Sequence, residues 1–524
     1  MFYKVRGSIN FLIPGKNRHG DKMKKKISDE EFISMTFTGR LDEDIDIIKS
    51  LLGHDDTVIF REFENRSNKK IRGCVIFTEV LVNNLVIDQN IVRPLLEYAA
   101  GETELGKGLS SYLAKAVVST DEVKTKSRIY DAISAILIGD TVVLIDTCPD
   151  AIVANSKKYA LRGISVPETE NAVNGPKEGF CELIVTNVGL IRRKVKNPKL
   201  KFRFVEVGKV SRTRVCVCYI EDLCPEHIIW DMVSRLKSFE IDSVLDTSYV
   251  GELISDHKTS PFDTMGKTER PDVVAAKLFE GRCALLVDGT PFALTVPFLF
   301  LENFQASEDY YENYYFASFV RILRFLAFFV AVSLPAIYVA LLSYHKEVLP
   351  RELLRSIAAS RASVPFPAVV EMFILLILFD LLREAGVRLP KAIGVTVSTV
   401  GAIVLGQSIV SANIVSTEMI IIVAICSLAS FLTPKLESVS GLLRLFLLAL
   451  SAMLGIYGYT IGVVAFCAYI SSLSSFGVPF TAYAIPTSVG GAKDTYIRSP
   501  WRNMKTRPYA IQKKNKTRLR RFWR

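Results

Sequence analysis

Long uncharged stretches in the second half of the chain constrain its fold more than any other feature. Leu445–Ala492 contains 48 consecutive residues without a charged side chain, and Phe325–Tyr344 contains 20. An α-helix rises 1.5 Å per residue, so about 20 apolar residues cross the hydrocarbon core of a bilayer. We therefore predict an all-α polytopic membrane domain over residues 306–492, with four to five spans.

The charged first part of the chain predicts a cytosolic α+β region of two subdomains. Residues 1–28 are expected to be a solvated basic leader, followed by subdomains at residues 29–166 and 167–305. The boundary is placed at Pro167–Gly179 because this stretch is rich in turn-forming residues. Nine scattered cysteines and the lack of a signal-peptide pattern near the N-terminus favour free thiols in a reducing compartment.

Strand-type patterning recurs through both predicted subdomains. It predicts strands at Thr57–Phe63, Arg72–Phe77, Lys199–Val207, Arg212–Ile220, Cys283–Val287 and Pro291–Val296. A further hairpin is predicted from Ala135–Ile138 and Thr141–Ile145, because the glycine and aspartate between them suit a tight turn. Amphipathic spacing and helix-start signals predict helices after Pro225 and after Thr268.

Enzyme chemistry is not expected, because the sequence has no phosphate-cradling glycine loop and no nucleophile elbow. One group of residue types would suit zinc, namely Cys216, Cys218, Cys224 and His227. The first spacing is too short for a usual zinc knuckle, and strand alternation places Cys216 and Cys218 on one face. Packed free thiols are the favoured interpretation, so we expect no metal and no cofactor.

Net charge is confined to the end of the chain. Residues 493–524 contain 12 lysines and arginines and one aspartate, which equals the formal net charge of +11 for the whole chain. A nucleic-acid-binding domain would carry its positive charge on a folded face, so we expect no nucleic-acid partner. A basic segment next to membrane spans is typical of a cytosolic tail that lies on anionic lipid.

Two acidic residues interrupt the apolar segment Ala362–Leu382. A carboxylate at mid-bilayer costs about 2.5–3.5 kcal/mol even on lenient scales, so Glu371 is expected to face a water-filled path or a partner. The alternative is that Glu371 lies near the interface and extends towards water. Asp380 is close to Arg383 and Glu384, which favours an interfacial position.

Small and polar residues give the next segment, Ala392–Thr417, a distinct character. A helix-packing stripe is predicted from the small residues Gly394, Ser398, Ala402 and Gly406. Gln407 and Asn413 either hydrogen-bond to neighbouring helices or line a pore. Ser471–Ala492 is rich in glycine and proline and predicts a re-entrant or broken segment.

Several longer motifs resemble the A subunit of the spore germinant receptors of endospore-forming bacteria, the GerA type. The matching segments are Pro167–Arg193, Thr268–Pro297, Glu308–Tyr311, Val364–Pro367, Leu382–Pro390 and Ser475–Pro479. They occur in the order typical of that family. Two places depart from its pattern: Pro261-Phe262-Asp263 stands where that family usually has a second proline, and Phe480-Thr481-Ala482 after Pro479 follows a looser form.

The resemblance implies a multi-pass protein of the endospore inner membrane whose N-terminal region and C-terminal tail are cytosolic. It implies a permease-like B subunit and a C-subunit lipoprotein as partners, and a homo-oligomer that acts as a nutrient-gated ion channel. Under this hypothesis the pore or gate candidates are Glu371, Gln407 and Asn413. The alternatives are a non-conducting scaffold, a paralogue that accompanies the dipicolinate channel, and, ranked last for want of an internal repeat, a secondary transporter.

Overall fold

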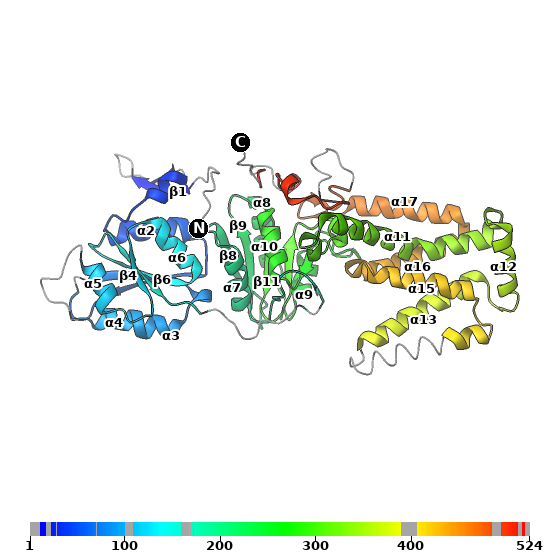
Figure 1. Ribbon diagram of the computed structural model, residues 1–524, viewed down its shortest axis with the longest axis horizontal. Coiled ribbons are helices and arrows are strands. Elements are labelled where there is room, and N and C mark those ends of the chain that lie inside the picture. The colour runs from blue at the N-terminus through cyan, green and yellow to red at the C-terminus, as the bar shows by residue number, and fades with distance from the viewer. Residues whose placement is uncertain are drawn as a thin grey trace. The chain divides into compact units, whose positions relative to one another are not determined.

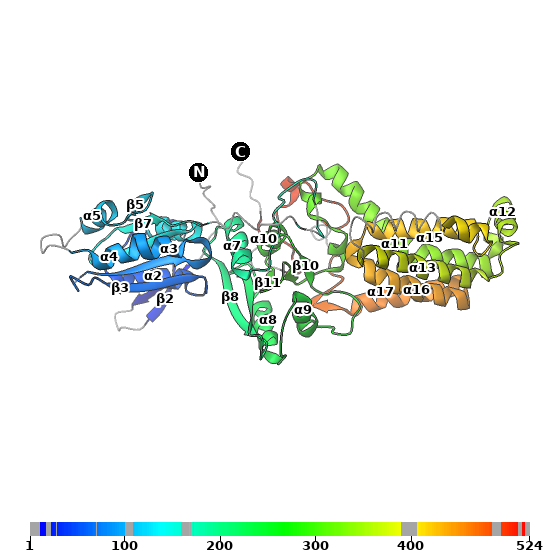
Figure 2. The same ribbon diagram turned by 90° about the horizontal axis from the view of Figure 1, so that it is seen from below.

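The computed structural model divides the chain into two compact units, which are described separately. Unit 1 comprises residues 1–255, 265–297 and 506–518, and unit 2 comprises residues 256–264, 298–505 and 519–524. The structure describes residues 11–16, 22–27, 29–69, 71–99, 108–158, 167, 169–170, 172–388, 406–484, 494–511 and 516–518. Figures 1 and 2 show the elements in two views.

The first sheet of unit 1 has helices on both faces. Its strand order is β3-β4-β6-β7-β5, with bounds β3 (Val58–Glu64), β4 (Arg72–Thr78), β5 (Val123–Lys126), β6 (Asp140–Ile145) and β7 (Ala151–Asn155). One core lies between the sheet and α1 (Asp29–Ser34), α2 (Leu41–Leu52) and α6 (Ile129–Ile138). The other lies under the π-helix Ile87–Val92, α4 (Arg93–Glu97) and α5 (Leu109–Ala116), and the short α3 (Asn84–Val86) precedes the π-helix without a buried residue. Burial on both faces explains why β4 and β6 are almost continuously apolar.

The predicted hairpin at Ala135–Ile138 and Thr141–Ile145 is wrong in its first arm. Residues 135–138 are the last turn of α6, and only the second arm forms a strand, β6. Gly139 ends the helix with φ of +99°, a left-handed conformation that glycine adopts readily. A short apolar run satisfies helix and strand patterns alike, and here the buried helical spacing from Ile129 onward decides the outcome.

The second sheet of unit 1 confirms the remaining predicted strands. Its order is β10-β12-β11-β9-β8, with bounds β8 (Leu200–Val207), β9 (Thr213–Ile220), β10 (Gly266–Thr268), β11 (Cys283–Val287) and β12 (Ala293–Val296). One face packs on α7 (Ile184–Lys194) and α10 (Pro271–Phe279). On the other face α8 (Glu226–Ser238), which follows Pro225 as predicted, places Met232 Sδ 3.8 Å from Cys283 Sγ. Helix α9 (Thr247–Ile254) follows α8 in the chain.

Buried charge joins the two sheets of unit 1. Arg192 and Asp55 form an ion pair with both side chains fully buried, and the Arg192 guanidinium lies 4.7 Å from the Phe202 ring centroid. Beside it, the Lys201 ammonium donates to the Leu51 carbonyl at 2.7 Å, and burial lowers the pKa of this lysine below its ordinary value. The turn after α2 is thereby bound to strand β8.

Regular structure begins earlier than the sequence indicates. Strands β1 (Phe11–Lys16) and β2 (Lys22–Ile27) pair antiparallel within the segment we expected to be a solvated leader. A hairpin is formed by backbone hydrogen bonds, which a basic composition does not forbid. The predicted boundary at residue 167 follows residues 159–166, which lie outside the described part of the chain.

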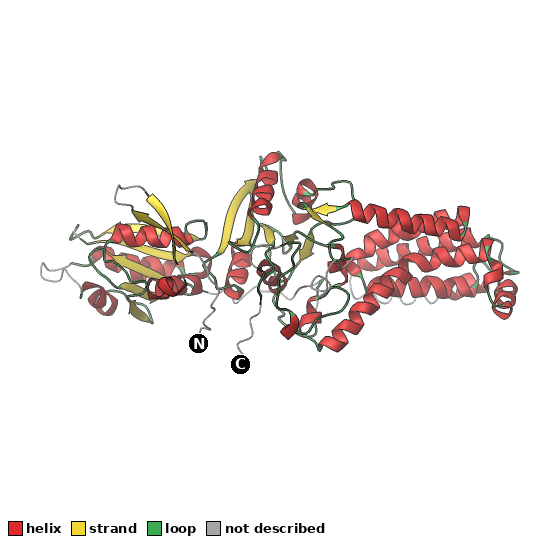
Figure 3. Ribbon diagram, turned by 90° about the horizontal axis from the view of Figure 1, so that it is seen from above, coloured by secondary structure: helices red, strands yellow, loops and turns green. Residues whose placement is uncertain are grey.

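Unit 2 is predominantly helical (Figure 3). Its helices are α11 (Tyr314–Tyr344), α12 (Arg351–Arg361), α13 (Ala368–Arg388), α15 (Thr417–Phe431), α16 (Glu437–Leu454) and α17 (Ile456–Ser472). By length and composition, two described helical segments could cross a membrane, Tyr314–Tyr344 and Pro434–Leu454. The predicted four to five spans are therefore not confirmed, and the short strand pair β13 (Ser474–Ser475) with β14 (Val478–Pro479) departs from an all-α unit.

The predicted re-entrant segment has partners outside the helices. The Ser474 amide donates to His257 Nε2 at 3.1 Å, and the Ser475 hydroxyl donates to the Thr264 carbonyl at 2.6 Å. The Phe300 amide donates to the Phe480 carbonyl at 2.9 Å. Residues 474–480 are therefore bound to the loop 256–264 and to Phe300, and these bonds satisfy part of their backbone without a helix.

Removing one partner of the Arg192–Asp55 pair should destabilise unit 1. We expect Asp55→Asn to lower the free energy of unfolding by about 3–5 kcal/mol, because the Arg192 charge would stay buried without its counter-charge. The matched control is Asp88→Asn, since Asp88 forms an exposed pair with Arg61 and should cost less than about 1 kcal/mol. Urea unfolding with hydrogen exchange at β8 measures both, and equal losses would contradict the assignment.

Candidate functional site

Glu371 lies at the meeting point of two helix N-termini. It occupies the first turn of α13 and is 1% exposed. Its Oε1 accepts hydrogen bonds from the backbone amide and the hydroxyl of Ser416, the N-cap residue of α15. Its Oε2 lies 3.5 Å from Arg361 Nη2 at the end of α12. We define Glu371, Ser416 and Arg361 as the Glu371 cluster.

The local sequence explains this placement. Proline cannot continue a helix but suits its start, and Pro365 and Pro367 separate α12 from α13. The first turn of α13 therefore begins just after Pro367, whose carbonyl accepts from the Glu371 amide at 3.1 Å. A carboxylate near helix N-termini is favoured by the helix dipole and by amide donors that have no partner inside their helix.

Asn413 belongs to the same end of the helices. Its side-chain oxygen accepts from the Ser363 hydroxyl at 3.1 Å, and its φ of +52° is in the left-handed region that asparagine tolerates. Nearby, the Ser360 hydroxyl donates to Glu418 at 2.7 Å. The structure thus brings two of the three predicted pore residues, Glu371 and Asn413, to one loop region.

The third predicted pore residue, Gln407, and the described part of the packing stripe lie on one short helical stretch. Gln407 is exposed on a short helical stretch at residues 406–411. Of the four stripe residues, Gly394, Ser398 and Ala402 lie outside the described residues. A Cβ added to Gly406 would meet no atom within 4 Å, so this glycine makes no close helix contact within the described part of the chain.

A second charged site lies farther along α13. Asp380 accepts from Arg444 of α16 at 2.9 and 3.1 Å, and Arg444 is 4% exposed. Asp380 is nine residues after Glu371, or about 14 Å along the helix axis. The sequence did signal Arg444, which is the single charged residue between positions 438 and 492. We predicted an interfacial Asp380 and missed its partner.

Three polar atoms near Glu371 lack a hydrogen-bond partner among the described residues. They are Glu371 Oε2, Arg361 Nε and the Tyr338 hydroxyl of α11. A buried polar atom without a partner is costly in an apolar surrounding. This arrangement of one acceptor, one donor and one hydroxyl has the chemistry to hold a proton or a water molecule.

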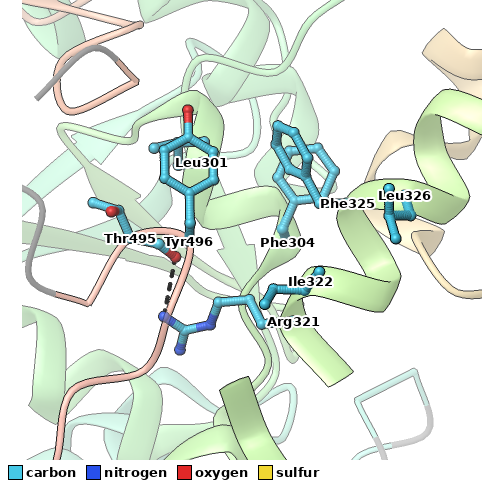
Figure 4. A pocket seen from close by; sticks show the side chains of 8 residues that line it. All are labelled: Leu301, Phe304, Arg321, Ile322, Phe325, Leu326, Thr495 and Tyr496. Atoms are coloured by element: carbon cyan, nitrogen blue, oxygen red, sulfur yellow. Dashed lines mark hydrogen bonds between the residues drawn. The ribbon is translucent and has the colours of Figure 1, made fainter. Parts of the chain in front are cut away.

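A third ionic network surrounds the start of α11. Arg321, 1% exposed, pairs with Asp309 at 3.1 Å and with Asp494 at 2.9 Å, and Arg324 pairs with Asp309 at 2.8 Å. Beside Arg321 is a cavity of about 110 Å³ lined mainly by apolar side chains (Figure 4). Asp494, the second residue of the predicted basic tail, is therefore bound to α11 through Arg321.

The cysteine group does not assemble into a metal site. Alternation places Cys216 and Cys218 on one strand face as predicted, with their sulfurs 3.8 Å apart and fully buried. Burial raises the pKa of the Cys218 thiol, which keeps it protonated. His227 is exposed on α8, and the described residues contain no metal-binding group of three or more His, Cys, Asp or Glu side chains.

Comparison with known proteins gives extended matches. The family model described as Bacillus/Clostridium GerA spore germination protein matches residues 46–510. Spore germination protein KA of Bacillus subtilis (strain 168) is 38% identical over 472 residues, or 90% of this chain and 86% of that protein. Spore germination protein GerLA of Bacillus cereus is 38% identical over 482 residues, which are 91% of this chain and 97% of that protein.

One solved structure is also similar. It is the crystal structure of the N-terminal domain of the A subunit of the Bacillus megaterium spore germinant receptor GerK3. The sequences are 28% identical, and the match covers 51% of this chain and 98% of that chain with a TM-score of 0.41.

Removing the Glu371 carboxylate should loosen the start of α15. We expect Glu371→Ala to speed hydrogen exchange of the amides at residues 416–420, because the N-cap residue loses its acceptor, at a cost of about 1–3 kcal/mol. Glu384→Ala is the matched control, since among the described residues Glu384 pairs with Arg388 alone, at the exposed end of the same helix. Unchanged exchange at residues 416–420 would show that Glu371 does not hold this helix.

Proposed function

This chain belongs to the Bacillus/Clostridium GerA family of spore germination proteins, and we propose from that premise that it is the A subunit of a nutrient germinant receptor. The family assigns it a role in spore germination. The proposed partners are a permease-like B subunit and a C-subunit lipoprotein, and the proposed location is the inner membrane of the endospore. The proposed role is not enzymatic.

Exposed apolar side chains support the membrane location. Leu428 of α15, Met453 of α16 and Val464 of α17 are each at least 66% exposed. Large apolar side chains exposed on several helices of one unit are ordinary where helices face lipid. We propose that unit 2 is embedded, with the N-terminal region and the C-terminal tail in the cytosol.

Within this location we propose that the chain contributes to an oligomeric, ligand-gated ion channel. The supporting observation is Glu371, a fully buried carboxylate that keeps one oxygen without a hydrogen bond among the described residues. Ionisable groups in membrane helices are costly and commonly mark ion or proton paths. Gln407 and Asn413 are the accompanying candidates, and the pore itself would form between copies of the chain.

A non-conducting scaffold is the second candidate, and one observation favours it. Ser416 and Arg361 already engage Glu371 within the same chain, so the carboxylate has a structural task independent of ions. A scaffold would transmit the nutrient signal through unit 1. It predicts that an apolar replacement such as Gln407→Leu leaves signalling intact.

Ion release from liposomes tests the channel. Liposomes carrying this chain with its B and C partners should release monovalent cations when a candidate nutrient is added, and Glu371→Gln should change the rate at equal protein level. Glu384→Gln removes an exposed charge from the same helix and should leave release unchanged. Release that is unaffected by Glu371→Gln would remove this residue from the conducting path, and no release from an intact complex would favour the scaffold.

A further inference from the structure

The cavity beside the start of α11 opens on the outer surface of unit 2. Its inner wall is formed by Leu301 and Phe304, which are 5% and 2% exposed. Its mouth is formed by Ile322 and Leu326, one helical turn apart on α11 and 42% and 56% exposed (Figure 4). The cavity is therefore accessible from the side of the helix that carries exposed apolar residues.

The chemistry of the lining selects an apolar occupant. Aromatic rings form much of the wall: Phe325 lies 4.7 Å from Phe304 and 5.3 Å from Tyr496, measured between ring centroids. The Arg321 guanidinium, the one charged group in the lining, is already bound to Asp309, Asp494 and the Thr495 carbonyl. A volume of about 110 Å³ is far more than one water needs, and apolar cavities of this order take up hydrocarbon.

The surface around the cavity carries the side chains of a membrane–water interface. Exposed aromatic residues gather at this end of α11 and on the segment beside it: Tyr311, Tyr315, Phe316 and Trp501. Trp501 lies 6.0 Å from Tyr310, and Arg498 stacks over Trp501 at 5.8 Å. Tryptophan and tyrosine concentrate at the headgroup level of bilayers. Arg502 and Lys505, which follow Trp501 in the chain, are exposed and positively charged.

We propose that this cavity and its aromatic and basic rim form a binding site for an anionic phospholipid. A short segment of one acyl chain enters the cavity through the Ile322–Leu326 mouth, and the headgroup binds the positive charge of Arg502 and Lys505. The inference rests on the proposed membrane location of unit 2. In this proposal the first part of the basic tail binds one lipid molecule next to α11. This differs from a general attraction of the tail to a charged membrane surface.

Lipid retention tests the site. The full chain is reconstituted in vesicles of phosphatidylcholine, alone or mixed with phosphatidylglycerol, and then extracted in mild detergent, and the co-purified phospholipid is quantified by mass spectrometry. The wild type should retain phosphatidylglycerol in preference to phosphatidylcholine. Leu326→Gln should lower retention of both lipids by at least about fourfold, the factor for one methylene group returned to water. Arg502→Gln should lower the preference for phosphatidylglycerol by about fivefold, the factor for one basic residue at an anionic surface.

Matched controls separate the site from general surface effects. Leu428→Gln changes another exposed leucine, on α15, and Arg355→Gln removes an exposed charge on α12. Both should retain lipid as the wild type does. Equal retention by all variants would overturn the site and would leave the cavity to a side chain of a partner subunit.

Vesicle flotation distinguishes failure of this inference from failure of the proposed function. If the wild type floats with both vesicle types but carries no more lipid than Leu326→Gln, the lipid site is overturned and the membrane location stands. If the wild type floats with neither vesicle type, the membrane location and the lipid site are both overturned.

Discussion

Burying a charged group away from water is costly, and this cost determines which distant segments of the chain meet. Arg192 meets Asp55 across 137 residues, and Arg444 meets Asp380 across 64. Such pairs add little stability compared with apolar packing of the same volume, but the loss of one partner is severe. The contact between the two sheets of unit 1 therefore depends on Asp55, and the contact between α13 and α16 depends on Asp380.

Elements set by local patterns could be predicted from the sequence, whereas contacts between distant residues could not. Strands β8, β9, β11 and β12 were predictable because their alternation and their turns are local. That Glu371 would need a partner or water was predictable, because it is a carboxylate in an apolar segment. The identity of its partner Ser416 was not predictable, since Ser416 is 45 residues away and serine is common in such segments.

One strand prediction was wrong and one set of partners was not predicted, because local sequence does not show which distant residues an element contacts. The last turn of α6 was assigned to a strand, because four apolar residues before a glycine fit either element until the core decides. Ser471–Ala492 was predicted to be re-entrant or broken because it is rich in glycine and proline. Within its described part Ser474 binds His257 and Ser475 binds Thr264, and no local pattern indicates these partners.

Helix α11 connects the two regions on which the proposals depend. Arg321 belongs to the ionic network beside the cavity, and Tyr338, 17 residues later and about 26 Å along the axis, lies within electrostatic reach of Glu371 and Arg361. Pro335 stands between them and lacks an amide hydrogen, so the carbonyl of Ala331 has no helical donor. A helix weakened there bends more easily than an unbroken one. The two regions therefore lie on one helix, with a missing backbone hydrogen bond between them.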